Sequence, residues 1–281
     1  GFHVTTPDAV ALQGLLAQMV DAGTTHCVIE VTSHSLVQQR VSACEFDIAV
    51  LTNITHEHLD YHGTLESYMN AKLSLFNQVS CTVPKPETNK LAVLNQDNEQ
   101  SYVYIKNKLK TDLVDYGIEV QATVNATNIS INERITYFDV TIGEDCFPVK
   151  TVLVGHYNIS NCLAAIAATY NGLAINVNYI QAGIASLNRI PGRMEHINIG
   201  QDFEAVVDFA HPPNSLRELL LSVRNTTNGR IIVVFGSAGL RDVSKRSWMG
   251  SIAAELADFT VITAEDPRTE SLSDIMADIE S

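Results

Sequence analysis

The sequence predicts an α/β protein: a mostly parallel sheet flanked by helices, with a small antiparallel β region, followed by a second, Rossmann-like unit. Three observations predict this fold class. Short apolar runs alternate with segments of helical periodicity over the first hundred residues, the pattern of βαβ units. Residues 122–154 change to a period of two, which is typical of antiparallel strands. Beyond residue 192 the strand–helix rhythm returns.

The first elements follow from the spacing of apolar residues. Residues 7–22 should form a helix that ends at Gly23 and presents one apolar face, made of Val10, Leu12, Leu15, Leu16, Met19 and Val20. The run 26–31 should be a buried strand. It should be followed by a helix over 35–41, a buried strand over 47–51, a polar loop, a helix over 65–79 and a buried strand over 91–95.

The later elements divide into two groups. Residues 123–131 and 135–142 alternate between apolar and polar side chains around a polar turn, so we expect an antiparallel hairpin appended to the sheet. An Ala-rich helix should cover 158–173. A second domain should begin at Gly192, which gives predicted domains of 1–191 and 192–281. Its predicted elements are strands over 205–209, 231–236 and 260–263, helices over 214–223 and 246–257, and one more helix before Ser281.

Composition narrows the class of protein. The chain has 281 residues, 46% of them hydrophobic, enough for one large domain or two ordinary ones with a real core. A net charge of −14 argues against a nucleic-acid partner. No apolar run approaches the length of a membrane span, and residues 1–6 do not look like a signal peptide. Five cysteines without a CxxC pair indicate a reducing cytoplasm and no structural metal. We therefore expect a cytoplasmic protein, acting as a monomer.

Polar side chains follow the two predicted strands over 26–31 and 47–51. The first ends in Glu30, followed by Thr32, Ser33 and His34, and the second leads into the segment TNITHEHLDYHGT at 52–64. The carboxyl ends of parallel strands meet at one edge of a sheet, where ligands bind. A carboxylate there can hold Mg²⁺ that bridges to phosphates. The alternative, that the Thr and Ser only cap the next helix, remains open at this point.

The other polar motifs are each ambiguous. His56, His58 and His62 with Glu57 and Asp60 resemble a metal-ligand loop, although the HExxH spacing of many zinc sites is absent. Lys72 by itself is compatible with a solvated helix face. The segment 155–161 could be a turn with an Asn cap, 191–193 a linker, and 236–242 a glycine-containing loop suited to a phosphate or carboxylate. Asp208 and His211 stand at a strand end, before a helix that Pro213 can start.

Taken in order, these segments resemble the Mur ligases, the ATP-dependent amide-forming enzymes of peptidoglycan synthesis. Within them the chain is most similar to the branch of UDP-N-acetylmuramoyl-tripeptide synthetases. The motifs that carry the resemblance span nearly the whole chain and stand in the family's order: Thr5-Thr6-Pro7, Glu30-Val31-Thr32-Ser33-His34 with Gln38 and Arg40, Thr52-Asn53 with His58-Leu59-Asp60, Ala71-Lys72, Asn158 with Asn161, Gly192-Arg193-Met194-Glu195, Asp208-Phe209-Ala210-His211, Lys245-Arg246 and Asp266-Pro267-Arg268.

The resemblance implies a role for each matching residue. Thr5, Thr6, Thr32, Gln38 and Arg40 would hold a UDP-MurNAc-dipeptide. Glu30 and His58 would bind Mg²⁺, and Lys72 would be carbamylated by CO₂, so that its new oxygens help to hold a second Mg²⁺; these three residues would be the catalytic ones. Asn53, Asn158, Arg193, Asp208 and His211 would surround ATP. Arg241, Asp266, Pro267 and Arg268 would recognise the incoming diamino acid.

The chain also departs from the family's pattern. Thr32 replaces a usual Ser, His56-Glu57 replaces a usual Arg-Asp, Glu265-Asp266 replaces a usual Asp-Asn, and the loop before Arg241 has less glycine than usual. The motif GxxxxGK[ST] occurs nowhere in the sequence. The N-terminal UDP-binding domain, the P-loop and the end of the C-terminal domain of the family are therefore expected to be missing. We accordingly expect the 281-residue chain to be inactive alone.

The activity that the resemblance implies is the ligation of a diamino acid to UDP-MurNAc-L-Ala-D-Glu through an acyl phosphate. We expect meso-diaminopimelate rather than L-lysine, because the guanidinium of Arg268 suits a distal carboxylate. Two alternatives stay open. One is a related ligase of the folylpolyglutamate or cyanophycin synthetase type, and the other is a non-catalytic remnant, which the missing P-loop favours.

Overall fold

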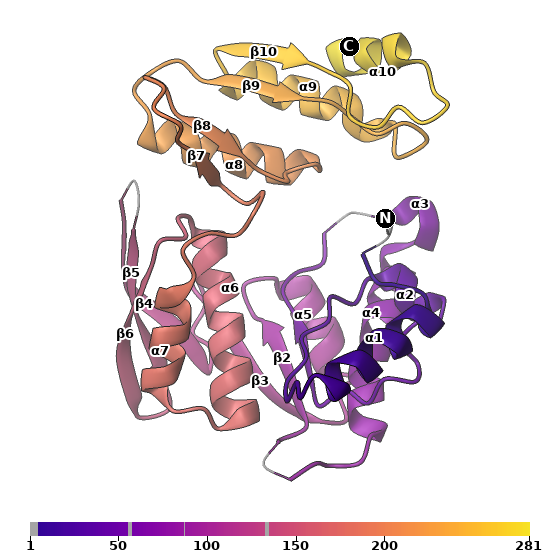
Figure 1. The fold of residues 1–281 in the computed structure, drawn as a ribbon, viewed down its shortest axis with the longest axis vertical. Helices are drawn as coiled ribbons and strands as arrows, with labels where there is room; N and C mark the ends of the chain where they lie inside the picture. The colour runs from indigo at the N-terminus through magenta and orange to yellow at the C-terminus, as the bar shows by residue number, and fades with distance from the viewer. Residues whose placement is uncertain (1–4, 56–57, 87, 133–134) are drawn as a thin grey trace. The chain divides into compact units, whose positions relative to one another are not determined.

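The computed structural model of the chain describes residues 5–55, 58–86, 88–132 and 135–281. These residues form two compact units, which we describe separately. The first unit contains the chain up to residue 130 together with residues 137–151 and 156–186. The second contains residues 131–136, 152–155 and 187–281. Figure 1 shows the helices and strands of both units as a ribbon.

A six-stranded sheet is the centre of the first unit. Its strands are, in spatial order, β1 (Ile48–Leu51), β2 (Leu91–Asn95), β3 (Asp112–Gly117), β4 (Val124–Ile131), β5 (Thr136–Ile142) and β6 (Asp145–Thr151). The pairings from β1 to β4 are parallel. Only two residues separate β5 from β6, a link that joins antiparallel neighbours. The predicted parallel sheet with an antiparallel addition is thus confirmed.

Burial explains why β2 lies inside this sheet. Leu91, Ala92, Val93 and Leu94 are all buried, so both faces of the strand are covered, as in parallel sheets with helices on each side. Helix α4 (Leu65–Cys81), capped by Thr64, packs its buried face against β1 and β2. Its buried residues are Tyr68, Met69, Leu73, Phe76 and Val79.

Helices α6 (His156–Ala167) and α7 (Val177–Ser186) cover strands of the same sheet, α6 against β2 and β3 and α7 against β6 (Figure 1). Helix α6 continues into a π-helical turn, Ala168–Gly172. A Cβ at Gly172 would lie 2.3 Å from Cδ1 of Ile48, so a larger residue in this turn would require the Ile48 side chain to move. Asn158 is the third residue of α6, so the alternative that it only caps this helix is not what the structure has.

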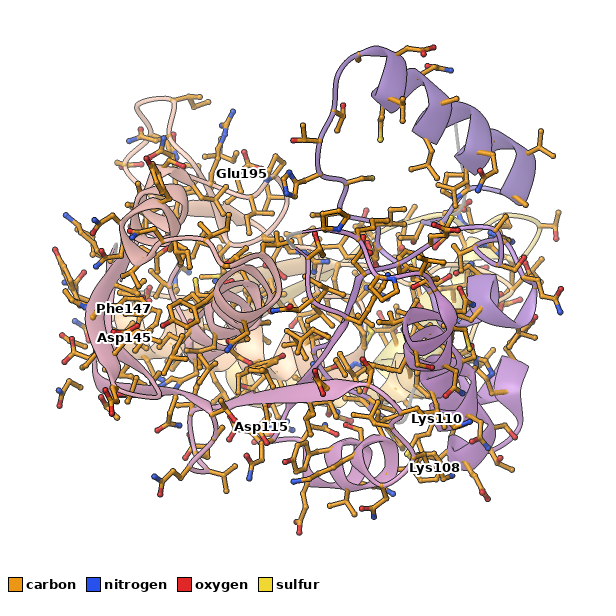
Figure 2. All side chains as sticks on the ribbon, turned by 90° about the horizontal axis from the view of Figure 1, so that it is seen from below. Lys108, Lys110, Asp115, Asp145, Phe147 and Glu195 are labelled. Atoms are coloured by element: carbon orange, nitrogen blue, oxygen red, sulfur yellow. The ribbon has the colours of Figure 1, made fainter. Side chains whose placement is uncertain are left out.

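Two other elements of this unit were not predicted. They are helix α5 (Glu99–Lys106) and strand β3, neither of which the apolar pattern predicted. Asp115 on β3 links them, because its carboxylate accepts hydrogen bonds from the Tyr102 hydroxyl at 2.6 Å and from Thr123 (Figure 2). Hydrogen bonds between polar side chains have no apolar period, so this contact could not be predicted from apolar spacing.

The largest correction concerns residues 26–31. They belong to no strand or helix in the described part of the chain, and Val28 is fully exposed. A strand needs a partner for its backbone groups, and β1 is the terminal strand of the sheet as described. Glu30 therefore does not sit at the end of a buried strand.

The helices beside this segment differ from expectation in a related way. Helix α1 (Ala9–Asp21), capped by Asp8, buries only Leu12, while Val10 and Val20 are mostly exposed, so the predicted apolar face is largely uncovered. Helix α2 (Ser33–Val37) begins earlier and ends earlier than the predicted 35–41. A single turn of helix, α3 (Leu59–His62), lies within the predicted polar loop.

The second unit contains two small sheets. Strands β9 (Ile232–Phe235) and β10 (Phe259–Ile262) are parallel, and β7 (Glu195–Ile197) and β8 (Ala205–Val207) are antiparallel. The predicted strand over 205–209 is therefore present but pairs with β7 rather than joining β9. Helices α8 (Pro213–Thr226) and α9 (Ser244–Leu256) pack on each other around Leu216, Leu220, Val233, Met249 and Ile252, and α10 (Leu272–Glu280) packs on α9.

Pro213 is the first residue of α8, as predicted, where its missing N–H is tolerated. None of the helices in the described ranges is both long and apolar enough to span a bilayer.

Candidate functional site

Thr6 ties together several residues that the sequence analysis assigned to a substrate site. Its hydroxyl, almost completely buried, donates to the Glu30 carbonyl at 2.9 Å and accepts from the Thr32 N–H at 3.2 Å. Arg40 donates from Nη1 to the Thr6 carbonyl at 2.8 Å. Thr5 is exposed beside this network. The structure thus brings Thr6, Thr32 and Arg40 together, and much of their bonding capacity is already used to hold the loop.

Thr32 also has the capping role that the sequence left open. Its side chain accepts a hydrogen bond from the Ser35 N–H at 3.2 Å, at the start of α2. The capping and substrate-binding interpretations are compatible, because a hydroxyl has two acceptor lone pairs and one donor. Gln38, at the end of α2, is exposed and donates to the Tyr61 hydroxyl at 3.3 Å.

Three histidines gather at the ends of α2 and α3. The ring of His34 lies 5.2 Å from that of His58 and 5.6 Å from that of His62. His62 stacks on Tyr68 of α4 at 5.1 Å, and its Nε2 lies 2.9 Å from the buried Ser33 hydroxyl. His58 adopts a left-handed backbone with φ 60°, which turns the chain into α3. His56, Glu57 and the side chain of Asp60 lie outside the described residues.

Lys72 is a partly buried base of this region. It lies one turn after Tyr68 on α4, and its ammonium donates to the Val31 carbonyl at 3.3 Å. Burial lowers the pKa of Lys72, and the negative charge of Glu30 opposes that shift only in part. Glu30 itself is exposed. The structure therefore places an amine that loses its proton more easily than usual within the electrostatic reach of a carboxylate.

The possible metal ligands near Lys72 would suit a hard cation such as Mg²⁺ only together with further oxygen ligands. In the described part of the chain no group of three or more His, Cys, Asp and Glu side chains is arranged to hold a metal ion. Glu30 supplies one carboxylate and His58 one imidazole, whereas Mg²⁺ prefers several oxygen ligands and retains waters or binds phosphates. A carbamate on Lys72 would add the missing protein oxygens. Glu30, His58 and Lys72 therefore suit Mg²⁺ if Lys72 is carbamylated.

The residues assigned to the nucleotide divide between the two units. Asn53 is exposed just after β1, where Asn95 and Asn98 donate to the carbonyls of Thr52 and Ile54 at 2.9 and 3.3 Å and hold the loop. Asn158 is buried in the first turn of α6. Asn95 and Asn98 are positioning groups that the sequence analysis missed. Their signal was present, since Asn95 is the last residue of a predicted strand and Asn98 follows three residues later.

In the second unit, Arg193, Asp208 and His211 meet around Phe209. The guanidinium of Arg193 lies 4.7 Å from the centre of the Phe209 ring, and the His211 ring lies 5.0 Å from it. Asp208 accepts from the Met194 and Ala210 N–H groups, both at 2.8 Å. Phe209 is exposed, so this is an aromatic surface with a cation against it, which suits a planar base. Sequence reasoning noted Phe209 in its motif but gave it no role.

Glu195 and Lys245 support this cluster. Glu195 accepts from the Gly192 N–H at 2.8 Å and pairs with Arg189 at 3.3 Å, which fixes the turn that carries Arg193 (Figure 2). Lys245 donates to the His211 carbonyl at 3.1 Å. The motif Gly192-Arg193-Met194-Glu195 is thus a turn in which Glu195 serves the backbone and Arg193 is left to face Phe209.

The two arginines assigned to the diamino acid are both exposed. Arg241 follows Leu240 in the loop after β9, and Arg268 lies in the loop after β10. Arg268 has φ 51°, and its Nε lies 3.6 Å from the Asp266 carboxylate. The loops touch, because the Gly239 N–H donates to the Asp266 carbonyl at 2.8 Å. Arg241, Asp266, Pro267 and Arg268 are therefore parts of one loop pair.

Comparisons with known proteins identify the family to which both parts of the chain are similar. The family model described as "Mur ligase middle domain" matches residues 2–169, and that described as "Mur ligase, glutamate ligase domain" matches residues 192–281. A Bacillus licheniformis protein named UDP-N-acetylmuramoyl-L-alanyl-D-glutamate--2,6-diaminopimelate ligase is 41% identical over 278 residues, which are 98% of this chain and 56% of that protein. A protein of the same name from Synechococcus elongatus is 40% identical over 277 residues, covering 98% of this chain and 54% of its own length.

Solved structures show the same relationship. A structure of a UDP-N-acetylmuramoyl-L-alanyl-D-glutamate--2,6-diaminopimelate ligase is similar with a TM-score of 0.68 and 30% identity, over 98% of this chain and 55% of that one. The folylpolyglutamate synthase of Mycobacterium tuberculosis has a TM-score of 0.67 at 16% identity, over 85% of this chain and 53% of that one, a likeness of fold alone. The chain spans little more than half the length of these relatives. The first family model covers more than half of the chain, and the chain belongs to the Mur ligase family.

Proposed function

We propose that this chain is the part of an ATP-dependent ligase that adds a diamino acid, meso-diaminopimelate, to UDP-MurNAc-L-Ala-D-Glu. The names of relatives at 37–41% identity support this reaction. The D-Glu carboxylate would take the γ-phosphoryl group of ATP to form an acyl phosphate. The amine of the diamino acid would then attack that carbonyl carbon, and inorganic phosphate would leave. Because the chain covers little more than half of those relatives, the residues it contains account for only part of the machinery.

The observation that carries this proposal is the environment of Lys72. A carbamate forms when a neutral amine attacks the carbon of CO₂ and releases a proton, so the lysine must lose its ammonium proton at ordinary pH. Burial lowers the pKa of Lys72 and favours the neutral amine. A lysine on a solvated helix face would have no such environment, so the structure argues against that alternative.

Glu30, His58 and a carbamylated Lys72 would hold Mg²⁺. When bound, the ion supplies charge neutralisation between two anions, the substrate carboxylate and the γ-phosphate. The protein's own contribution is position: Val31, through its carbonyl, and the buried face of α4 fix where the Lys72 nitrogen lies. Transfers of this type depend mainly on such positioning and on electrostatic stabilisation.

The other roles follow from the two units taken separately. Thr5, Thr6, Thr32, Gln38 and Arg40 would bind the UDP-MurNAc-dipeptide, with Arg40 as the cation of that set. Asn53 and Asn158 in the first unit and Arg193, Asp208 and His211 in the second would contact ATP, with the base against Phe209. Arg241 and the Asp266-Pro267-Arg268 loop would bind the diamino acid. We place the domain boundary between residues 191 and 192, where Gly192 has φ 67°.

The carbamate provides a test that does not require a complete enzyme. The purified chain is equilibrated with ¹³C-labelled bicarbonate and Mg²⁺ at mildly alkaline pH, and the carbamate carbon is observed by NMR. We expect one slowly exchanging carbamate signal that disappears in Lys72→Ala. Lys85→Ala is the matched control, since Lys85 is exposed and paired with Asp47 at 2.7 Å. A spectrum unchanged by Lys72→Ala would remove the carbamate from the proposal.

A further inference from the structure

A fully buried arginine lies behind the two loops that carry Arg241 and Arg268. Arg246, on α9, has no exposed side-chain surface. Its Nη1 and Nη2 donate to the two carboxylate oxygens of Glu270 at 2.7 and 2.8 Å, a bidentate pairing. Nη1 also donates to Asp278 on α10 at 2.8 Å. Arg246 therefore joins two helices and the loop that contains Glu270.

Glu270 connects this buried cation to both loops. Its second carboxylate oxygen also accepts from the Leu240 N–H at 2.8 Å, and its own N–H donates to the Pro267 carbonyl at 3.0 Å. The Gly239 N–H donates to the Asp266 carbonyl at 2.8 Å. The Glu270 carboxylate therefore accepts a hydrogen bond from Leu240, the residue immediately before Arg241. Glu270 itself lies two residues after Arg268 in the sequence.

The contact between the loops leaves no room for adjustment. A Cβ on Gly239 would lie 2.1 Å from the Pro267 carbonyl oxygen, so only glycine permits the approach. Leu240 and Arg268 both have left-handed backbones, with φ 54° and 51°. Non-glycine residues hold such conformations only where the surroundings enforce them. The contacts of Arg246 and Glu270 supply that enforcement.

We propose that Glu270, held by Arg246, is a positioning residue that sets the separation of Arg241 and Arg268 and thereby the selectivity for the diamino acid. The inference rests on the proposed function of this loop pair. Two guanidinium groups at a fixed separation favour a substrate with two carboxylates over one with a single carboxylate and a distal ammonium. Arg246 is fully buried and so cannot touch a substrate, and the two carboxylate oxygens of Glu270 accept hydrogen bonds from Arg246 and from the Leu240 N–H.

Asp278 allows this role to be separated from a purely structural one. It contacts the same guanidinium as Glu270 does, but from α10, and its carboxylate accepts no loop N–H among the described contacts. Asp278→Asn should therefore weaken the buried ion pair without releasing either loop. Glu270→Ala should weaken the ion pair and also free the Leu240 N–H.

The experiment compares Glu270→Ala, Asp278→Asn and the unmodified chain in three measurements. The first is amide hydrogen exchange of Leu240, Arg241 and Arg268, the second is thermal unfolding, and the third is calorimetric titration with meso-diaminopimelate and with L-lysine. We expect both variants to unfold at lower temperature. Only Glu270→Ala should accelerate exchange at the three amides, by tenfold or more, and weaken diaminopimelate binding by about tenfold. Arg268→Ala serves as the positive control for the loss of diaminopimelate binding.

Each result bears on one claim. If the two variants changed exchange and binding equally, or if Glu270→Ala left both unchanged, Glu270 would be only a structural ion-pair partner and the inference would fall. If the unmodified chain bound neither amino acid, the assignment of the loop pair to a diamino acid would fail, and exchange would still decide whether Glu270 fixes the loops. Binding of both amino acids with equal affinity would overturn the selectivity claim alone.

Discussion

Lys72 is a residue whose environment reduces the stability of the folded state. Burial lowers its pKa, which means that the folded state disfavours the ammonium form. The free energy of unfolding is therefore reduced at every pH below the folded pKa, and the loss disappears as the pH rises above the unfolded value of about 10.4. A residue kept for packing alone would not have this property.

We accordingly expect Lys72→Met to stabilise the first unit at pH 7. The thioether side chain fills similar space without a charge, and the gain should be about 1 kcal/mol, since the Val31 carbonyl loses its donor in exchange. Urea unfolding at pH 7 measures the change. Lys85→Met is the control: its exposed pair with Asp47 should contribute less than about 1 kcal/mol. A destabilised Lys72→Met would show that the lysine is held by favourable contacts instead.

For single residues, sequence analysis correctly placed some of the predicted site residues near one another. It did not identify the hydrogen-bonding partners that fix their positions. Thr6, Thr32 and Arg40 were predicted to act together and lie in one hydrogen-bonded network. Arg193 and His211 likewise lie against the Phe209 ring, and Asp208 accepts a hydrogen bond from the Met194 N–H next to Arg193. The bond from Leu240 to Glu270 spans thirty residues, a pairing that no local spacing could reveal. The catalytic and binding roles themselves stay predictions.

For helices and strands, apolar spacing predicted the element correctly where one side of it is buried against the rest of the unit. Helix α4 and strand β2 bury their apolar residues and lie where the pattern predicted them. The run 26–31 is also mainly apolar, yet it forms no strand in the described chain, because a strand needs a hydrogen-bonding partner for its backbone as well as apolar side chains. Periodicity reports the side chains only, so it could not distinguish the two cases.

Replacing a helix glycine by alanine should have opposite effects on stability at Gly14 and at Gly250. At Gly14, in α1, an added Cβ would meet no atom within 4 Å, so Gly14→Ala should stabilise by about 0.5 to 1 kcal/mol through helix propensity. At Gly250, in α9, a Cβ would lie 1.8 Å from the Ile279 carbonyl oxygen of α10. Gly250→Ala should push α10 away and destabilise by about 1 to 3 kcal/mol.

Thermal unfolding of both variants, followed by circular dichroism, measures these effects. The pair controls for helix propensity, because both substitutions exchange the same residues inside a helix. Equal stabilisation of the two variants would mean that α10 does not rest on Gly250, and the packing of α9 against α10 described above would then be wrong.

At the scale of the whole molecule, the net charge of −14 coexists with many carboxylates that accept specific hydrogen bonds. In the second unit, Ile231 through its N–H and Arg224 through its guanidinium lower the pKa of Asp258. Arg246, followed by the Leu240 N–H, lowers the pKa of Glu270 to about 2. The acidic composition is thus partly structural, since these carboxylates join helices and loops that lie far apart in the sequence.

This arrangement predicts the acid sensitivity of the second unit. A carboxylate whose pKa is lower in the folded state contributes stability above its unfolded pKa and loses it as the pH falls through the folded value. For Glu270 that window runs from its usual value of 4.5 down to about 2. Urea unfolding of the second unit at a series of pH values should therefore show a steep loss of stability across this window, and Glu270→Gln should flatten it. Glu265→Gln, a change to an exposed side chain of the same loop, should leave the slope unchanged.

Because Glu270→Gln keeps an acceptor for the Leu240 N–H, a loss of slope in that variant would come from the lost charge pairing with Arg246 rather than from the loop hydrogen bond. An unaltered slope in Glu270→Gln would mean that other carboxylates set the acid response, and that the Arg246–Glu270 pair is weaker in solution than its distances indicate.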